Sequence, residues 1–174
     1  MRVIAGKHRG RVLCEFKGDA VRPTSDRARE ALFNILQCEI RGAEFLDLFC
    51  GSGAVGIEAI SRGAKGVTFV DKSAESIKIT KKNLDAVGET ARIITSDAID
   101  FADKTDEKFD IIFLDPPYKF DATEILVKLP RLLAADGVIV YEHGDDKKIS
   151  NEELELQKSR RYGIAIFDFF KVKK

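Results

Sequence analysis

The apolar and polar positions of this chain alternate in a way that predicts short buried strands separated by helices. The clearest unit is residues 45–56, F-L-D-L-F-C-G-S-G-A-V-G, where an apolar run ends in a glycine-rich turn and an amphipathic stretch begins. Such runs are typical of parallel strands that are buried on both faces, and Gly51 and Gly53 permit a sharp turn. We therefore predict a strand, a loop and a helix that begins near Ala54.

The same pattern continues along the chain and predicts an α/β fold. Helices are expected at residues 54–62, 73–87 and 121–134, the last interrupted by Pro130. Further strands are expected at residues 66–70, 91–95, 109–114 and 137–142. Two last strands, at 154–162 and 164–173, are expected to close the sheet as an antiparallel hairpin.

Two elements are predicted ahead of the first strand of this sheet. Residues 2–5 and 12–16 are β-prone runs around the turn G-K-H-R-G-R, which predicts a β-hairpin with a basic tip. Residues 24–36 have helical apolar spacing, with Thr24 or Ser25 as the cap. Arg22, Arg27 and Arg29 crowd the start of that helix, where the dipole disfavours positive charge. We expect these arginines to be exposed, and they hint at an anionic partner.

Acidic residues lie in or directly after three of the predicted strands. Asp47, Asp71 and Asp97 would meet at the carboxyl edge of a parallel sheet, where open α/β sheets bind ligands. Asp71 comes about 20 residues after the glycine turn, which suits hydrogen bonds to ribose hydroxyls. Asp47 lies within a buried strand and needs a cation or a hydrogen-bond donor. Any one of the three could instead be a helix cap.

The fourth strand runs directly into the sequence Asp115-Pro116-Pro117-Tyr118. Two prolines cannot extend a strand ladder and fix an extended, rigid loop. We expect the loop to hold Asp115 and Tyr118 over the cleft at the sheet edge. The alternative is an ordinary turn with a capping aspartate and a core tyrosine.

Composition and charge add a broad class to this picture. A chain of 174 residues with 44% apolar content fits one domain, residues 1–174, with 1–22 as a basic hairpin and 23–174 as the body. The formal net charge is zero, but residues 1–29 and 158–174 each carry +5 and the middle carries −10. This distribution suits an acidic body with a basic rim for a polyanion. Ordinary solvated lysines on edge strands are the alternative.

The remaining chemistry-bearing residues indicate no metal site and no membrane segment. Cys14, Cys38 and Cys50 are odd in number and widely spaced, as expected of reduced thiols in the cytoplasm. His8 has no nearby cysteine cluster and reads as a surface or RNA-facing residue. No apolar run approaches the roughly 20 residues that span a bilayer. We expect a cytoplasmic protein, without a metal and monomeric.

Taken together, these motifs resemble a known enzyme class. D-L-F-C-G-S-G, Asp71, Ser96-Asp97-Ala98 and D-P-P-Y look like a class I S-adenosylmethionine-dependent methyltransferase that modifies an exocyclic amine. The opening R-V-I-A-G-K-H-R-G-R and the stretch R-P-T-S-D-R-A-R-E-A-L-F-N-I-L resemble, more narrowly, the bacterial RsmD family. The resemblance implies a Rossmann-like, seven-stranded, mostly parallel sheet, and an enzyme that methylates guanine N2 in 16S ribosomal RNA of the small subunit.

The resemblance also implies a role for each matching residue. The methionine end of S-adenosyl-L-methionine would lie against Asp47 and the loop, the ribose hydroxyls on Asp71, and the adenine against Asp97 and Ala98. The cofactor-binding set it implies is Asp47, Cys50, Gly51, Ser52, Gly53, Asp71, Lys72, Asp97 and Ala98. The catalytic set is Asp115, Pro116, Pro117 and Tyr118. The RNA-binding set is Lys7, His8, Arg9, Arg11, Arg22 and Thr24.

The chemistry of an aromatic amine agrees with this assignment. Its lone pair is delocalised into the ring, so the enzyme needs hydrogen-bond acceptors that favour a pyramidal nitrogen. The Asp115 carboxylate and the Pro116 carbonyl can accept the two amine hydrogens. Tyr118 would stack on the extruded base.

Three other functions fit parts of the sequence. A DNA or RNA adenine-N6 or cytosine-N4 methyltransferase uses the same D-P-P-Y logic, although 174 residues leave little room for a DNA-recognition domain. A non-catalytic RNA- or nucleotide-binding module would not need Asp115 and Tyr118 together. An NAD-dependent oxidoreductase would match the spacing of Gly51, Gly53 and Gly56.

Overall fold

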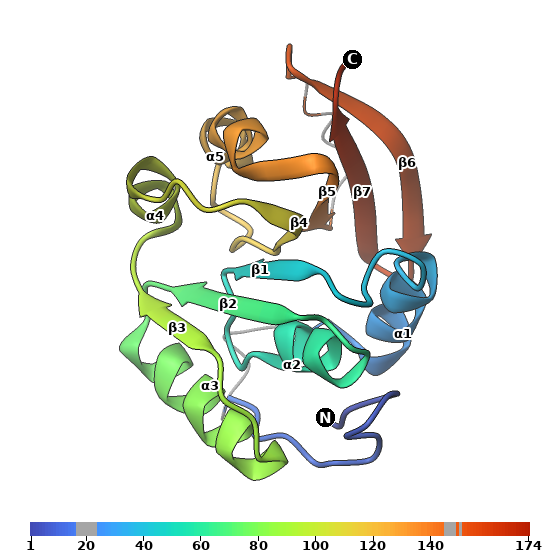
Figure 1. Ribbon diagram of the computed structural model, residues 1–174, viewed down its shortest axis with the longest axis vertical. Helices are drawn as coiled ribbons and strands as arrows, with labels where there is room; N and C mark the ends of the chain where they lie inside the picture. Colours follow the sequence, from blue (N-terminus) through green and yellow to red (C-terminus); the bar gives the residue numbers. More distant parts are fainter. Residues whose placement is uncertain (17–23, 145–148, 150) are drawn as a thin grey trace.

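The fold is built on one seven-stranded sheet with the strand order β3-β2-β1-β4-β5-β7-β6 (Figure 1). The computed structural model describes residues 1–16, 24–144, 149 and 151–174. The strands are β1 (Glu44–Leu48), β2 (Gly66–Asp71), β3 (Arg92–Thr95), β4 (Phe109–Leu114), β5 (Leu133–His143), β6 (Leu154–Tyr162) and β7 (Ala165–Val172). The first five pair in parallel, and β7 pairs antiparallel with both β5 and β6. The predicted mostly parallel sheet with a C-terminal antiparallel hairpin is confirmed.

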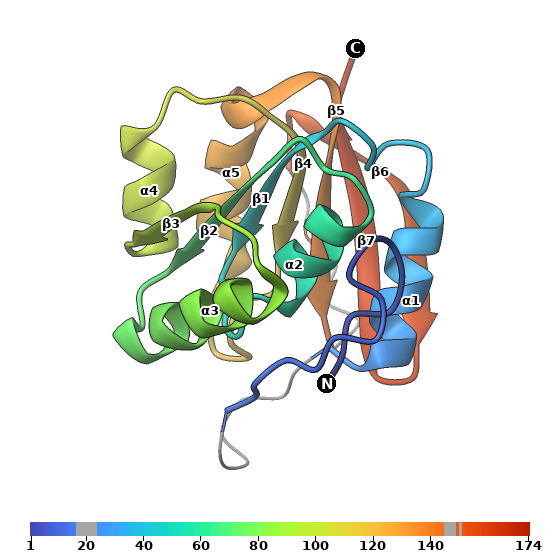
Figure 2. The ribbon, with the colours of Figure 1, turned by 60° about the horizontal axis from the view of Figure 1, so that its bottom comes forward.

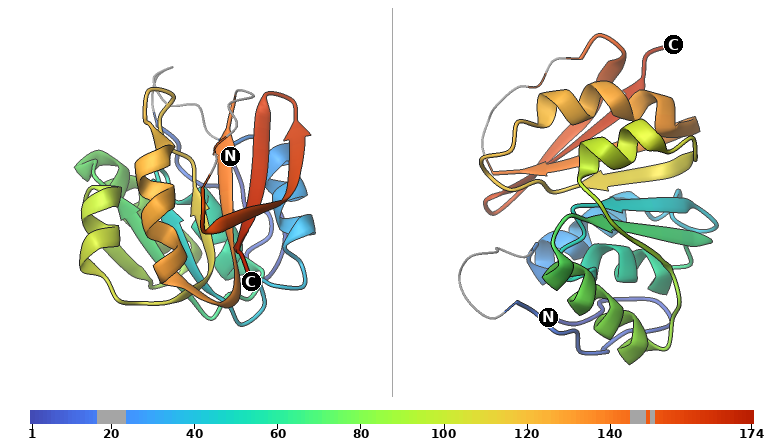
Figure 3. Two further views of the ribbon diagram at one scale, coloured as in Figure 1. Left: turned by 90° about the horizontal axis from the view of Figure 1, so that it is seen from above. Right: turned by 90° about the vertical axis from the view of Figure 1, so that its left-hand side faces the viewer.

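Helices cover both faces of the sheet (Figure 3). One face carries α1 (Asp26–Ile35), α2 (Ala54–Ser61) and α3 (Ala74–Val87), and the other carries α4 (Ala98–Lys104) and α5 (Ala122–Lys128), which η1 (Leu129–Leu132) extends. Each layer has its own apolar core, with Phe45, Ile111 and Phe167 under the first and Leu46, Ile112 and Leu126 under the second. Neighbouring residues of a strand thus feed opposite cores, which explains the nearly continuous apolar runs.

The sequence signals for helix ends operate as expected. The Ser25 hydroxyl accepts a hydrogen bond from the Ala28 N–H, and the Ser73 hydroxyl accepts one from the Ser76 N–H. Gly88 ends α3 in the left-handed conformation, which glycine adopts without a steric cost. The predicted helices 24–36 and 73–87 are confirmed, and helix α4, which was not predicted, begins at the cap Asp97.

The N-terminal segment is less regular than the predicted β-hairpin. Residues 2 and 12 form a single antiparallel bridge, and neither of the predicted runs is a strand. The segment is held instead by the body of the protein (Figure 2). The Glu58 carboxylate of α2 accepts hydrogen bonds from the backbone N–H groups of Ile4 and Ala5, at 2.8 and 3.0 Å. We call residues 1–16 the N-terminal arm.

Arg29 is a second correction, because it is buried rather than exposed. Its guanidinium donates to the carbonyl of Arg2 and to Asp26, 2.9 Å away, and lies 3.9 Å from Glu58. An internal ion cluster therefore neutralises this charge near the start of α1, and Arg29 gives no indication of an external anion. Arg22 lies outside the described residues.

Candidate active site

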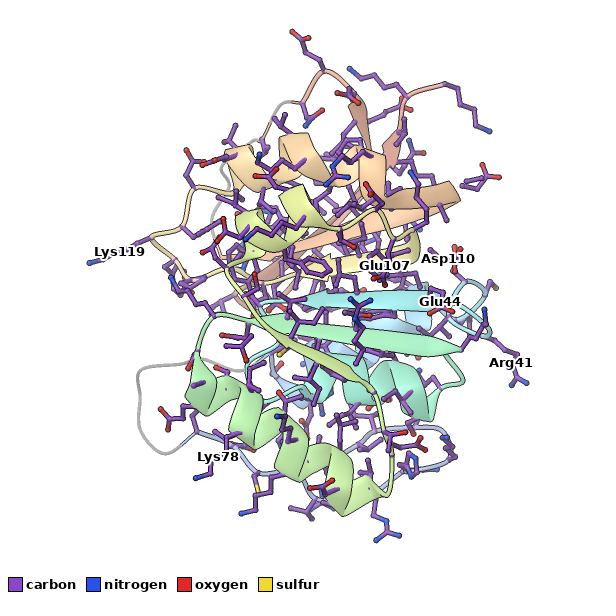
Figure 4. The ribbon with its side chains drawn as sticks, turned by 60° about the vertical axis from the view of Figure 1, so that its left-hand side comes forward. Arg41, Glu44, Lys78, Glu107, Asp110 and Lys119 are labelled. Atoms are coloured by element: carbon purple, nitrogen blue, oxygen red, sulfur yellow. The ribbon has the colours of Figure 1, made fainter. Side chains whose placement is uncertain are left out.

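The acidic residues singled out in the sequence lie at the carboxyl edge of the sheet. Asp71 is the last residue of β2, Asp97 follows β3 and Asp115 follows β4. Figure 4 shows this edge by Lys119, from the loop after β4, and the opposite edge by Glu44 and Asp110. The predicted cofactor and catalytic residues belong to the carboxyl edge, since most of them lie at the ends of β1, β2, β3 and β4 or in the loops that follow.

Asp71 organises the backbone of two of these loops. Its Oδ2 accepts a hydrogen bond from Gly51 N–H and its Oδ1 accepts one from Ser73 N–H, both at 2.9 Å. A carboxylate oxygen has two acceptor positions, so both oxygens can accept a further bond. Lys72, next in the chain, is exposed. The geometry leaves Asp71 able to meet a pair of hydroxyl groups.

Asp47 is buried inside β1, and a hydrogen bond meets it rather than a cation. Its Oδ2 accepts from Gly56 N–H at 2.9 Å. Burial raises the pKa of Asp47 to about 7, against the effect of that hydrogen bond, and the nearby Asp71 charge raises it further. Gly56 is required here because a Cβ atom would lie 2.2 Å from the Phe69 ring. The third glycine of the motif therefore lets α2 approach the sheet.

The glycine-rich loop is fixed from the side by α3. The Thr80 hydroxyl donates to the Gly51 carbonyl at 2.9 Å, and Asn83 Nδ2 donates to the Ser52 carbonyl at 2.8 Å. Gly53 (φ +77°) leaves no room for a side chain, because a Cβ would lie 2.8 Å from Thr80. Sequence reasoning missed Thr80 and Asn83. Polar residues at buried positions of an amphipathic helix were the available signal.

Cys50 lies in the loop after β1, and Asp97 and Ala98, the residues predicted to contact adenine, follow β3. Burial raises the pKa of the Cys50 thiol, which lies 3.6 Å from the Thr80 hydroxyl, so it stays protonated. Asp97 caps α4, since its Oδ1 accepts from Ile99 N–H at 2.9 Å. Ala98 is buried directly behind it. The cap uses one oxygen of Asp97 and leaves the other without a bond among the described residues.

The D-P-P-Y loop places Asp115 and Tyr118 in different surroundings. Asp115 is half-buried, and its pKa is raised well above the ordinary value by desolvation and by the charges of Glu142 and Asp47. Tyr118 is 74% exposed, so it is not a core residue. Its hydroxyl faces Gly144, where a Cβ atom would come within 2.9 Å. Phe120 N–H donates to the Pro117 carbonyl at 2.8 Å and closes the turn.

Glu142, near the end of β5, is a residue of this edge that the sequence reasoning did not assign. It is only 8% exposed, and its Oε2 accepts a hydrogen bond from the Thr24 hydroxyl at 2.6 Å. Burial raises its pKa to about 7, against the opposing effects of Thr24 and His143. Thr24 was predicted to contact RNA, and the structure places it on Glu142. No local sequence pattern predicts the hydrogen bond between Thr24 and Glu142, which are 118 positions apart.

The basic tip of the N-terminal arm lies away from this edge. Lys7 and His8 both contact Glu89, at 2.5 and 2.6 Å, just beyond the C-terminal end of α3. Although partial burial raises the pKa of Glu89, the hydrogen bonds from Lys7 and His8 lower it overall. A helix of 14 residues, about 21 Å long, separates this contact from the start of α3. Arg9 and Arg11 are exposed and form no ion pair within the described part of the chain.

Neither a membrane-spanning helix nor a metal-binding cluster is found among the described residues. None of the helices in those ranges is long and apolar enough to cross a membrane. No group of three or more His, Cys, Asp or Glu side chains in the same ranges is arranged to hold a metal ion.

Comparisons with known proteins identify relatives of the whole chain. The family model described as conserved hypothetical protein 95 matches residues 1–171. Ribosomal RNA small subunit methyltransferase D of Haemophilus influenzae is 37% identical over 179 residues, which cover 98% of this chain and 93% of that protein. A solved structure of Escherichia coli yhhF, described as a methyltransferase, has a TM-score of 0.88 at 30% identity and covers 99% of this chain and 98% of that one. A more distant methyltransferase structure, complexed with S-adenosylhomocysteine, shares the fold with a TM-score of 0.71 at 16% identity, over 90% of this chain and 52% of that one.

Proposed function

The chain belongs to the RsmD family, described as conserved hypothetical protein 95, and we propose that it methylates the exocyclic N2 amine of a guanine in 16S ribosomal RNA. It is an S-adenosyl-L-methionine-dependent methyltransferase with the class I fold of its relatives. The observation that carries the proposal is the position of Asp115. A half-buried carboxylate follows β4 directly, on the edge of the sheet that also carries the glycine-rich loop.

The residues of the loop suit this cofactor. Asp71 has acceptor positions for two vicinal hydroxyls, Asp97 has one for the adenine amine, and Ala98 gives the ring an apolar wall. The methionine end would lie along residues 50–53, whose backbone α3 holds in place. When bound, S-adenosyl-L-methionine supplies a methyl group on a positively charged sulfur, which is already a strong electrophile.

Residues of the chain orient the N2 amine of the guanine for methyl transfer. Asp115 and the Pro116 carbonyl accept the two N2 hydrogens, which favours a pyramidal nitrogen with its lone pair directed at the methyl carbon. As the N–C bond forms and the C–S bond breaks, the nitrogen becomes cationic and acidic. The ionised Asp115 then takes one N2 proton. Tyr118 stacks on the extruded guanine, which suits its 74% exposed ring.

In this proposal the N-terminal arm binds the RNA in addition to the carboxyl edge of the sheet. Arg9 and Arg11 contact phosphates away from the target nucleotide, because the arm's tip lies at the far end of α3, a helix about 21 Å long. Lys7 and His8 contribute less, since both already contact the Glu89 carboxylate. We propose that the protein works in the cytoplasm as a monomer and forms one domain, residues 1–174, in which 23–174 is the catalytic body and 1–22 precedes it. The single domain is supported by the hydrogen bonds that tie the N-terminal arm to Glu58 and Asn83 of the body.

Labelled nucleosides test the proposal directly. The protein and methyl-labelled cofactor are incubated with small subunits from a strain that lacks this methylation, and the RNA is digested. We expect label in N2-methylguanosine, and label in N6-methyladenosine would contradict the proposal. Asp136→Asn serves as the control for Asp115→Asn, since Asp136 is exposed and asparagine tolerates its positive φ of 61°.

A further inference from the structure

Glu142 is a buried carboxylate at the active edge that the proposed methyl transfer leaves without a role. Leu114 of β4 pairs with Tyr141 of β5, so the next residues, Asp115 and Glu142, are neighbours on adjacent parallel strands. Adjacent strands lie about 4.8 Å apart. Phe113 and Val140, two positions earlier, share one apolar core, so both carboxylates belong to that same face of the sheet.

The hydrogen bonds of Glu142 leave room for a ligand. Oε2 accepts the Thr24 hydroxyl at 2.6 Å, whereas Oε1 has no hydrogen-bond partner in the described ranges. The charged groups around it are Asp115 and His143, with Asp47 beyond Asp115. The buried Glu142 and the half-buried Asp115 repel each other when both are ionised, and a role in holding Thr24 alone does not require the second acid. The pair is a set of acceptors suited to a ligand with two adjacent donors.

Among the bases with an exocyclic amine, guanine alone presents two adjacent donors on its Watson–Crick edge, N1–H and the N2 amine. Adenine presents an acceptor at N1 beside its N6 amine, and cytosine presents an acceptor at N3 beside its N4 amine. An extruded base is read along this edge. We propose that Glu142 accepts the N1–H of the target guanine while Asp115 accepts an N2 hydrogen, which makes Glu142 the residue that selects guanine. This inference rests on the proposed function.

A base analogue separates the reading of N1 from the methyl transfer itself. 2,6-Diaminopurine keeps the amine at position 2, but its N1 is an acceptor. After the methylated guanine has been mapped, small-subunit RNA is ligated with guanine or 2,6-diaminopurine at that position and assembled into subunits. The rates are compared at pH 8.5, where Glu142 is ionised, since its pKa is about 7.

The wild-type protein should prefer guanine over 2,6-diaminopurine by about ten- to a hundredfold in kcat/KM, the typical effect of one hydrogen bond to a charged group. Glu142→Gln should lower that ratio about tenfold or more, because the glutamine amide can donate to N1 of the analogue. Glu44→Gln is the matched control, since Glu44 lies at the opposite edge of the sheet (Figure 4), and it should keep the wild-type ratio.

Two results would overturn the inference while leaving the proposed function intact. One is equal wild-type rates on the two bases, which needs no variant and therefore decides the question even if Glu142→Gln does not fold. The other is an unchanged ratio in a folded Glu142→Gln protein, which would reduce Glu142 to an anchor for Thr24. By contrast, wild-type protein that labels adenine and not guanine would refute the proposed function itself.

Discussion

Replacing Glu58 with glutamine should destabilise the protein by about 3–5 kcal/mol, the usual cost of removing one partner from a buried ion pair. Glu58 is fully buried in α2. Its Oε2 accepts Ile4 N–H at 2.8 Å, and its Oε1 accepts Ala5 N–H at 3.0 Å and Arg62 Nε at 2.7 Å. Glutamine has one oxygen, so at least one of these donors would face an amide NH2 group.

The buried charge of Arg29 adds to this magnitude, because Glu58 is one of its two acidic neighbours. Arg29 is buried 3.9 Å from Glu58, and its Nε has no hydrogen-bond partner among the residues that the structure describes. Each hydrogen bond to a charged group contributes about 1.5–3 kcal/mol, so losing one bond and the countercharge of Arg29 reaches the stated range. These contributions to the free energy of unfolding are not additive, because Glu58 and the groups that contact it form one cluster.

Urea denaturation followed by circular dichroism measures the free energy of unfolding of both proteins. Amide hydrogen exchange at Ile4 and Ala5 should also accelerate in the variant, because these N–H groups bond to Glu58. Glu30→Gln, an exposed change on α1, is the control and should stay within about 0.5 kcal/mol of wild type. A loss below about 1 kcal/mol in Glu58→Gln would refute the reasoning that this carboxylate anchors the arm.

Four further outcomes concern the active edge and the RNA. Asp115→Asn should slow single-turnover methylation by about 10²–10³ and leave cofactor affinity in calorimetry unchanged; a wild-type rate would remove Asp115 from the mechanism. Asp71→Asn should weaken cofactor binding by about 1–3 kcal/mol, and unchanged affinity would place the ribose elsewhere. Turnover should rise with pH through about 7, because Glu142 has a raised pKa and stays protonated at lower pH. In Glu142→Gln the pH profile of turnover should move to lower pH, because Asp115 loses its like-charged neighbour. An identical pH profile in the variant would contradict this coupling between the two carboxylates. Replacing Arg9 and Arg11 with alanine should reduce the salt slope of RNA binding by about 0.7–0.9 per lost phosphate contact; an unaltered slope would make them a solvated surface.

Several features of the fold could be predicted from the sequence because they depend on local patterns. Apolar runs and helical spacing mark elements whatever their neighbours are, so β1, β2, β4 and α3 lie close to where they were expected. Caps are equally local, as at Ser73 and Gly88. The carboxyl edge could be predicted because parallel strands end together, which places Asp47, Asp71 and Asp115 in one region of the sheet.

Other features depend on contacts between distant segments, which no local pattern encodes. Arg29 looked exposed because arginine usually is, yet Asp26 and Glu58 bury it, and Glu58 lies one turn from Arg62 on another helix. The basic tip at Lys7 looked free to grip RNA, but it lies on Glu89, 82 positions away. The sequence gives the sign of each charged residue, but it does not show which residue will pair with it.

The sequence by itself determined most of the helices and strands, the sheet, and the positions of Asp71, Asp97 and Asp115 along its carboxyl edge, because period, capping and strand direction are properties of short segments. Only the tertiary structure decided which acids meet. The register of β4 against β5 sets Asp115 beside Glu142, and the start of α1 returns Thr24 to the same carboxylate. Register and helix docking arise from packing between segments far apart in the chain, where a shift of one residue turns a side chain to the other face. The acceptor pair at the active edge exists only once that packing is complete.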